Sequence, residues 1–229
     1  MAVVTAIVPS PRKEGRFDLA LDGAAAGRIS LDIVERFGLR VGVVVDDAKR
    51  AALDEAMGEL VTYDRALNLL AAQARSRRDL RRRLLQKGEP EPRIDAALDR
   101  LAAAGLLNDD AFARQFTRSR VLGRGASKRR VRDELFRRGV AGAAADEAIA
   151  EVFEDEQVDE STLVETAARK KLRTLGGLDA PTRRRRLYAF LARKGYDGEL
   201  IRNAMTRVLA PADAAELRDD LAGVDEGTD

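Results

Sequence analysis

Three short segments of this sequence concentrate arginine and lysine. Residues 75–87 contain seven basic residues and one acidic residue, residues 127–138 contain six and two, and residues 183–194 contain six and none. The planar guanidinium group of arginine can donate two parallel hydrogen bonds to a phosphate or a carboxylate. The chemistry that these segments offer is therefore the binding of an anionic partner, either a nucleic-acid backbone or an acidic protein surface.

A glycine follows each basic segment and brings the three segments into register. Gly88, Gly139 and Gly195 lie 51 and 56 residues apart, and an arginine stands ten residues before each of them. An ordinary exposed helix face is the alternative interpretation, because arginine is also a good helix former. Three copies at one position favour a binding role. The candidate partner-binding residues are Arg77, Arg78, Arg81, Arg82, Lys128, Arg129, Arg130, Arg132, Arg184, Arg185 and Arg186.

The apolar residues among the cations predict the helices that carry them. In the first copy Leu80 and Leu84 stand eight and four residues before the glycine, and leucine or valine occupies both positions in the other copies. This spacing predicts a helix with one buried face. Glycine suits the left-handed residue that ends a helix, and the cation before it suits the negative end of the helix dipole.

A further helix is predicted on either side of each basic helix. The preceding helices are expected at residues 63–74, 109–120 and 161–175, and apolar residues six, ten and thirteen positions beyond each glycine predict the following ones. Units of three amphipathic helices usually bury their faces by stacking on neighbours. The predicted fold class is mainly α, an elongated array of three tandem three-helix repeats at residues 63–107, 108–158 and 159–209.

The first 62 residues are predicted to form a small α+β module ahead of the repeats. Residues 3–8 and 16–22 predict strands, and the second has the alternating pattern of a half-buried strand. A short helix is expected at residues 30–37, ended by Gly38. Another helix is expected from Asp46 to about residue 60.

Charge is distributed unevenly along the chain. The net charge is +2 overall, but it is −2 over residues 1–62, +10 over residues 63–209 and −6 over residues 210–229. The last segment has few large apolar residues, so a disordered acidic tail is predicted there. We hypothesise that this tail shields the basic helices.

Composition excludes many classes of protein. The chain has no cysteine and no histidine, which excludes disulfides, thiolate zinc sites and histidine-based catalysis. Asp109 and Asp110 fit the start of a helix better than a magnesium site. Gly123-Arg124-Gly125 is interpreted as a flexible join rather than a phosphate loop. With no apolar stretch near the ~20 residues of a membrane helix and no signal-peptide pattern, we expect a monomeric cytoplasmic protein without catalytic activity, metal, cofactor or membrane contact.

Aromatic residues are few, and they do not predict a platform for stacking on nucleic-acid bases. Phe112, Phe116 and Phe136 stand at apolar helical positions and are predicted to lie in the core. Tyr188 takes the place of an arginine in the other two copies, so it is predicted to lie on the charged surface.

The second repeat carries the most specific motif, which consists of Gly105-Leu-Leu-Asn-Asp-Asp-Ala-Phe-Ala113, Arg118-Ser-Arg120, Lys128-Arg129, Glu134-Leu135 and Arg138-Gly139. This motif resembles the central signature of the RecX family of regulatory proteins, and the resemblance covers residues 63–209. Residues 1–62 are similar to the amino-terminal extension of longer members. A long connection at residues 176–181 and the acidic tail depart from the family pattern.

The resemblance implies a role in the control of DNA repair, recombination and the SOS response. Family members modulate the RecA recombinase by lodging in the helical groove of its filament on single-stranded DNA. There they suppress ATP hydrolysis, strand exchange and co-protease action. Some members also bind single- or double-stranded DNA directly. The expected partners of this chain are therefore the RecA filament and DNA.

A second class of function is a sequence-independent DNA-binding protein built from tandem helix-turn-helix units. In such motifs the last helix enters the groove of the DNA. Here the third helices contain few arginines, with Arg93 and Arg100 in the first copy. This composition makes the second interpretation less favourable.

Overall fold

The computed structural model describes residues 1–11 and 13–209. The chain divides after Asn108 into two compact units. The described residues contain four hydrophobic clusters, one in the N-terminal module and one in each three-helix repeat. The fold is mainly helical with a small N-terminal strand module, as the sequence predicts. The predicted acidic tail, residues 210–229, lies outside the described residues.

A four-stranded antiparallel sheet forms the start of the first unit. Its strands are β1 (Ala2–Pro9), β2 (Arg16–Leu21), β3 (Ala24–Ser30) and β4 (Val44–Val45), in the spatial order β3-β2-β1-β4. In β1 and β2 the register pairs Ala6 with Ala20 and Val8 with Asp18. These two strands confirm the prediction from the sequence.

The sequence pattern does not predict β3 or the two-residue strand β4. Alanine and glycine, which are weak strand formers, make up most of β3. A Cβ atom at Gly27 would lie 2.7 Å from the sulfur of Met57, so the glycine allows the following long helix to approach the sheet. Helix α1 (Leu31–Arg36) begins directly after β3, where the Ser30 hydroxyl accepts a hydrogen bond from the backbone of Ile33. This helix confirms the predicted short helix.

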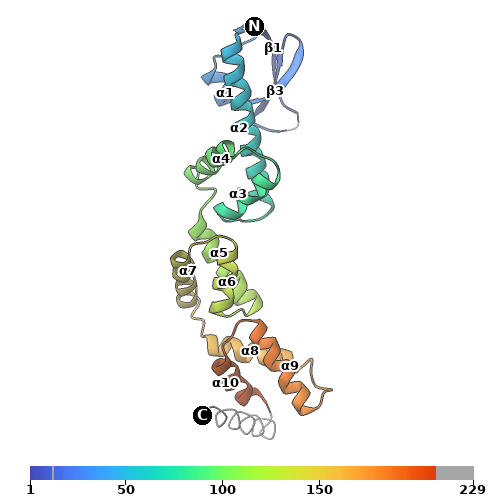
Figure 1. Ribbon diagram of the computed structural model, residues 1–229, viewed down its shortest axis with the longest axis vertical. Coiled ribbons are helices and arrows are strands. Elements are labelled where there is room, and N and C mark those ends of the chain that lie inside the picture. The colour runs from blue at the N-terminus through green and yellow to red at the C-terminus, as the bar shows by residue number, and fades with distance from the viewer. Residues whose placement is uncertain (12, 210–229) are drawn as a thin grey trace, which may run out of the picture. The chain divides into compact units, whose positions relative to one another are not determined.

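Helix α2 (Asp47–Ala72) runs for 26 residues from the N-terminal module into the first repeat (Figure 1). The prediction of two helices, one ending near residue 60 and one starting at residue 63, is wrong. No proline interrupts the segment. Thr62 is buried, and its hydroxyl donates a hydrogen bond of 3.2 Å to the backbone carbonyl of Gly58. The predicted module boundary therefore falls within a continuous helix.

The first repeat consists of the second half of α2, α3 (Arg77–Gln86) and α4 (Glu91–Ala103). Both predicted apolar stripes face its core. Leu80 and Leu84 of α3 are fully buried, and so are the residues of α4 at the predicted spacing, which are Ile94, Leu98 and Leu101.

The second repeat consists of α5 (Asp109–Arg124), α6 (Lys128–Arg137) and α7 (Gly142–Asp155). Helix α5 is four residues longer than predicted. Gly123 and Arg124 belong to it, so the interpretation of this segment as a flexible join is wrong there. The chain turns only at Gly125, which has a φ of 54°.

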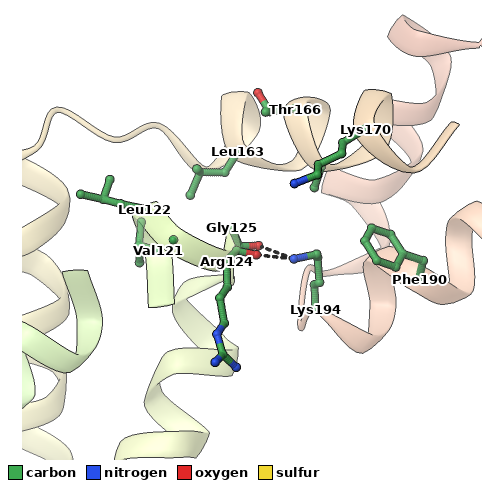
Figure 2. Close-up of a pocket in the computed structure, with 11 residues that line it drawn as sticks. Val121, Leu122, Arg124, Gly125, Leu163, Thr166, Lys170, Phe190 and Lys194 are labelled. Carbon is green, nitrogen blue, oxygen red and sulfur yellow. Dashed lines mark hydrogen bonds between the residues drawn. The ribbon is translucent and has the colours of Figure 1, made fainter. Parts of the chain in front are cut away.

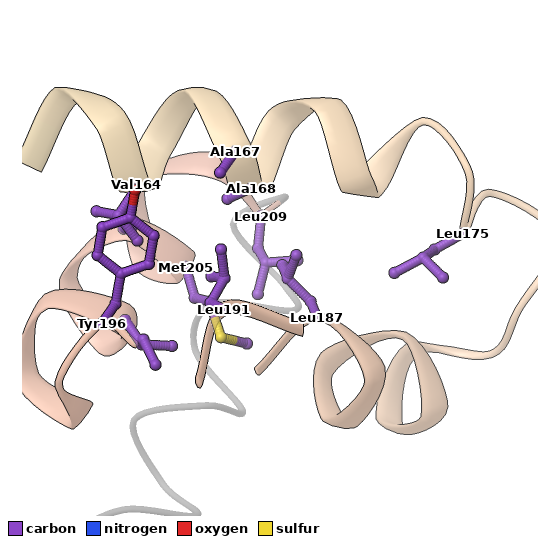
Figure 3. Close-up of a cluster of buried hydrophobic side chains, with 11 residues drawn as sticks. Val164, Ala167, Ala168, Leu175, Leu187, Leu191, Tyr196, Met205 and Leu209 are labelled. Carbon is purple, nitrogen blue, oxygen red and sulfur yellow. The ribbon is translucent and has the colours of Figure 1, made fainter. Parts of the chain in front are cut away.

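The third repeat consists of α8 (Glu160–Leu172), α9 (Ala180–Arg193) and α10 (Gly198–Val208). Figure 3 shows its core, in which side chains from all three helices meet. Leu187 and Leu191 carry the predicted stripe and are fully buried.

The second and third repeats meet at the start of α6 and the end of α9. The backbone N–H of Ser127 donates to the carbonyl of Lys194 at 3.3 Å, and the Tyr196 hydroxyl donates to the carbonyl of Gly125 at 3.0 Å. A Cβ atom at Gly195 would lie 2.6 Å from the Ser127 hydroxyl oxygen. This position therefore requires glycine for close packing as well as for its φ of 89°.

Candidate partner-binding surface

The three basic helices begin and end in similar ways. The side chains of Ser76, Ser127 and Asp179 cap α3, α6 and α9 by accepting hydrogen bonds from the first turn. The glycine that follows each helix has a positive φ, between 78° and 89°. Local sequence thus fixes both ends of each helix and the face that carries its cations.

One arginine in each copy is exposed at the same distance from the glycine. These residues, Arg78, Arg129 and Arg185, are called the equivalent arginines below. Within the described part of the chain, none of the three forms an ion pair with a carboxylate. Arg185 does act on Asp179, whose pKa lies below its usual value chiefly because it accepts a hydrogen bond from the Thr182 backbone. The equivalent arginines are therefore open to a partner at the same position of all three copies.

Asp79 neutralises three other cations of the first basic segment. Its carboxylate accepts hydrogen bonds from Arg75 at 2.9 Å and from Arg83 at 3.1 Å, and it also pairs with Arg82. Burial alone would raise the pKa of Asp79, but the hydrogen bonds from Arg75 and Arg83 outweigh it and hold the pKa below its usual value. Arg82 thus stays exposed but already has a partner.

Arg81 and Arg132 each stand seven residues before the glycine of their repeat. Both pair with acidic residues of the following helix. Arg81 on α3 lies 2.6 Å from Glu91 and 3.1 Å from Asp95, both on α4. Arg132 on α6 pairs in the same way with Asp146 on α7. The same pairing thus recurs in two repeats, and these two predicted site residues connect neighbouring helices.

Glu134 has the corresponding role inside the second repeat. It accepts hydrogen bonds of 2.8 Å from Arg120 on α5 and from Arg130 on α6. Burial would raise its pKa, but these two hydrogen bonds outweigh burial and lower the pKa below its usual value. Arg130 is therefore exposed but paired.

The residues eleven positions before the glycine have three different environments. Arg77 lies 2.6 Å from Asp99, and the ammonium group of Lys128 lies 4.6 Å from the centre of the Phe153 ring. Arg184, by contrast, is buried, with only 8% of its surface exposed. The structure thus corrects the expectation that Arg184 faces a partner.

The length of α9 explains why Arg184 differs. This helix begins fifteen residues before its glycine, whereas α3 and α6 begin eleven residues before theirs. Arg184 therefore lies beyond the first turn, one position along the buried stripe from Leu187 and Leu191. Arg185 and Arg186 follow it on the exposed side.

Two aromatic residues lie at the surface of the basic helices. Phe136 is 66% exposed, so the prediction that it lies in the core is wrong. Its apolar type at a helical position misled the prediction, because the buried stripe passes through Val131 and Leu135 instead. Tyr188 is 40% exposed, as predicted. Phe112 is buried and Phe116 is half-buried in the second core.

A basic pocket of about 460 Å³ lies where α6 meets the end of α9. Arg129, Arg130 and Arg193 contribute three cations to its lining, and Asp133 contributes one carboxylate. Sequence reasoning missed Arg193 as a site residue. Its position two residues before Gly195 could have indicated it, since that glycine packs against the start of α6.

The described part of the chain contains neither a candidate metal-ligand cluster nor a candidate membrane span. In residues 1–11 and 13–209, no group of three or more acidic side chains is arranged to hold a metal ion. Across the same residues, no helix combines the length and apolar composition needed to cross a bilayer.

Three-helix repeats with capped basic middle helices place this chain among the tandem helical-repeat proteins. Comparison with known families is more specific. The first, second and third three-helix domains of RecX match residues 63–101, 108–149 and 159–205. The chain belongs to the RecX family of regulatory proteins.

Individual relatives support this assignment. Regulatory protein RecX of Amycolatopsis mediterranei is 36% identical over 129 residues, which cover 56% of this chain and 72% of that protein. Regulatory protein RecX of Levilactobacillus brevis is 35% identical over 109 residues, which cover 48% of this chain. The match spans only 41% of the length of the Levilactobacillus brevis protein.

Solved structures share the fold at low sequence identity. A crystal structure of regulatory protein RecX matches with a TM-score of 0.67 and 22% identity, covering 87% of this chain and 97% of that one. The structure of RecX from Lactobacillus salivarius matches with a TM-score of 0.54 and 19% identity, covering 66% and 96%.

Proposed function

We propose that this chain binds the RecA filament on single-stranded DNA and inhibits the ATPase, strand-exchange and co-protease activities of RecA. It acts in the cytoplasm as a monomeric, non-enzymatic regulator of DNA repair and recombination. The family membership supports RecA as the partner. The exposed cations of α3, α6 and α9 make the contacts with the filament and its DNA.

The observation that carries this proposal is the exposure of the equivalent arginines. Arg78, Arg129 and Arg185 recur at one position of three helices, whereas most of their basic neighbours have partners within the chain. An exposed guanidinium can pair with a phosphate or carboxylate without first breaking an internal ion pair. A repeated exposed cation therefore suits an extended anionic partner such as a filament on DNA.

The test is a triple variant, Arg78→Glu with Arg129→Glu and Arg185→Glu. Three lost contacts of about 1 kcal/mol each should weaken half-maximal inhibition of the RecA ATPase more than tenfold. The matched control, Arg40→Glu with Lys49→Glu and Arg173→Glu, makes the same change in net charge elsewhere, at two exposed positions and at the half-buried Lys49. Full inhibition by the triple variant, or equal loss in the control, would contradict the proposal.

Direct DNA binding through the third helices is the rival function, and the structure disfavours it. Arg93 on α4 lies 2.7 Å from Glu55, and Arg100 lies 4.5 Å from the centre of the Tyr63 ring. Helix α7 contains no lysine or arginine. A protein that neutralises ~6–10 phosphates would lose ~10³–10⁵ in DNA affinity between about 50 and 200 mM salt, and its binding would not require RecA.

A further inference from the structure

A second pocket lies between the second and third repeats, and its lining does not include the equivalent arginines. Its volume is about 350 Å³, and it is formed by the end of α5, the middle of α8 and the end of α9 (Figure 2). These three helices lie in one compact unit. The pocket is lined by Val121, Leu122, Gly123, Arg124, Gly125, Leu163, Thr166, Ala167, Lys170, Phe190 and Lys194.

The charge of the pocket is entirely positive. Lys170, Lys194 and Arg124 belong to its lining, and the lining contains no carboxylate. Burial and the nearby charge of Lys170 lower the pKa of Lys194 below its usual value. An anion between the two ammonium groups would relieve their repulsion.

The rest of the lining is mostly apolar. Leu122 is 52% exposed, while Leu163 and Phe190 are half-buried. A leucine-sized side chain of a ligand would cover this surface and remove it from water. The pocket therefore suits a ligand with one acidic group next to one apolar group.

The contacts around Phe190 and Lys194 disfavour a nucleotide. The ammonium groups of Lys171 and Lys194 lie 5.5 and 5.4 Å from the centre of the Phe190 ring, so the ring is already engaged and a base would have to displace them to stack. The Lys194 ammonium also donates hydrogen bonds to the carbonyl oxygens of Arg124 and Gly125. These oxygens at the end of α5 would repel a doubly charged phosphate more than a single carboxylate.

We propose that this pocket binds a short acidic peptide segment of a protein partner. One carboxylate of the peptide lies between Lys170 and Lys194, and a neighbouring leucine or similar side chain packs on Leu122 and Leu163. Charge complementarity and the apolar floor together select this ligand class. The proposal does not depend on which partner the equivalent arginines contact.

The experiment is a titration of the full chain with the peptide acetyl-Glu-Leu-Glu-Leu-amide, followed by NMR of the methyl and lysine side-chain resonances. We expect shifts of Leu122, Leu163 and Lys170 that saturate. Lys170→Glu should weaken the apparent affinity at least tenfold. Arg173→Glu, which changes an exposed cation beyond the end of the same helix and outside the pocket, should leave the affinity unchanged.

Other results would overturn the proposal. Equal binding by Lys170→Glu, or equal binding of acetyl-Lys-Leu-Lys-Leu-amide, would show that the carboxylate is not recognised. Stronger binding of a four-residue thymidine oligonucleotide at the same resonances would assign the pocket to nucleic acid. Peptide binding that appears only in a variant ending at residue 209 would support the ligand class and identify residues 210–229, with seven acidic residues, as a competitor.

Discussion

Helices α3 and α9 have similar basic sequences but present their charge differently. Five of the seven cations in residues 75–87 form ion pairs, with Asp79 or with acidic residues of α4. Helix α9 contains no acidic residue, and Arg186 and Arg193 have no ion pair within the described part of the chain. Segment charge therefore overstates how many cations a partner can reach. The third repeat offers more exposed positive charge than the first.

Substitutions at the glycines that end the two helices should give the largest difference in the free energy of unfolding. Gly88 and Gly195 both have positive φ, but a Cβ atom at Gly88 would meet nothing within 4 Å, whereas one at Gly195 would lie 2.7 Å from the Arg130 Cβ. Left-handed strain and overpacking should make Gly195→Ala cost about 3 kcal/mol in the free energy of unfolding. Gly88→Ala should cost about 1 kcal/mol through strain alone. Chemical denaturation measures both, and equal losses would contradict the close packing at the end of α9.

Removing the internal partner of α3 should give the next largest effect. Asp79→Asn leaves Arg75, Arg82 and Arg83 without their shared carboxylate, so it should lower the free energy of unfolding by about 2 kcal/mol. The control Asp133→Asn changes an exposed acidic residue of α6 and should have little effect on stability.

The Asp79→Asn variant also has a defined pH dependence. Because the folded pKa of Asp79 lies below its usual value of 3.8, its stabilisation is complete above that pH and is lost as the pH falls through the lower folded value. The difference in unfolding free energy between the parent and the variant should therefore be constant near neutral pH and shrink below about pH 4. A difference that persists at still lower pH would exclude the ion pairs as its source.

The smallest expected effect is on inhibition of the RecA ATPase, and it compares the exposed cations of α9 with the paired cations of α3. Arg185→Ala with Arg186→Ala should weaken inhibition of the RecA ATPase about tenfold, from two contacts of about 0.7 kcal/mol each. Arg81→Ala with Arg82→Ala should weaken it less than about threefold, because these cations are already paired. Thermal melts show whether each variant stays folded. A larger loss in the α3 variant would reverse the order proposed for the two helices.

Much of the repeat architecture could be predicted from the sequence. Leu80, Leu84, Leu187 and Leu191 recur at fixed distances from a glycine, and local periodicity alone identifies such buried faces. The N-terminal module was harder to predict, because β3 consists mainly of small residues and its position depends on the approach of Met57. Propensity could not show that contact.

The candidate surface was predictable only in part. The sequence identifies which residues are cationic, but Arg81 and Arg132 find their partners on the next helix, which requires the folded arrangement of α4 and α7. Arg184 is buried because α9 starts one turn earlier relative to its glycine. In the sequence, the earlier start of α9 is visible only as the long connection at residues 176–181, which differs from the family pattern.

The uninterrupted course of α2 has a mechanical consequence. At 1.5 Å per residue its 26 residues make a rod of about 39 Å, with the strand module packed along one portion and the first repeat along the other. No loop between them can absorb a twist. A force that twists the strand module would therefore be transmitted through α2 to Ala66 and the core of the first repeat.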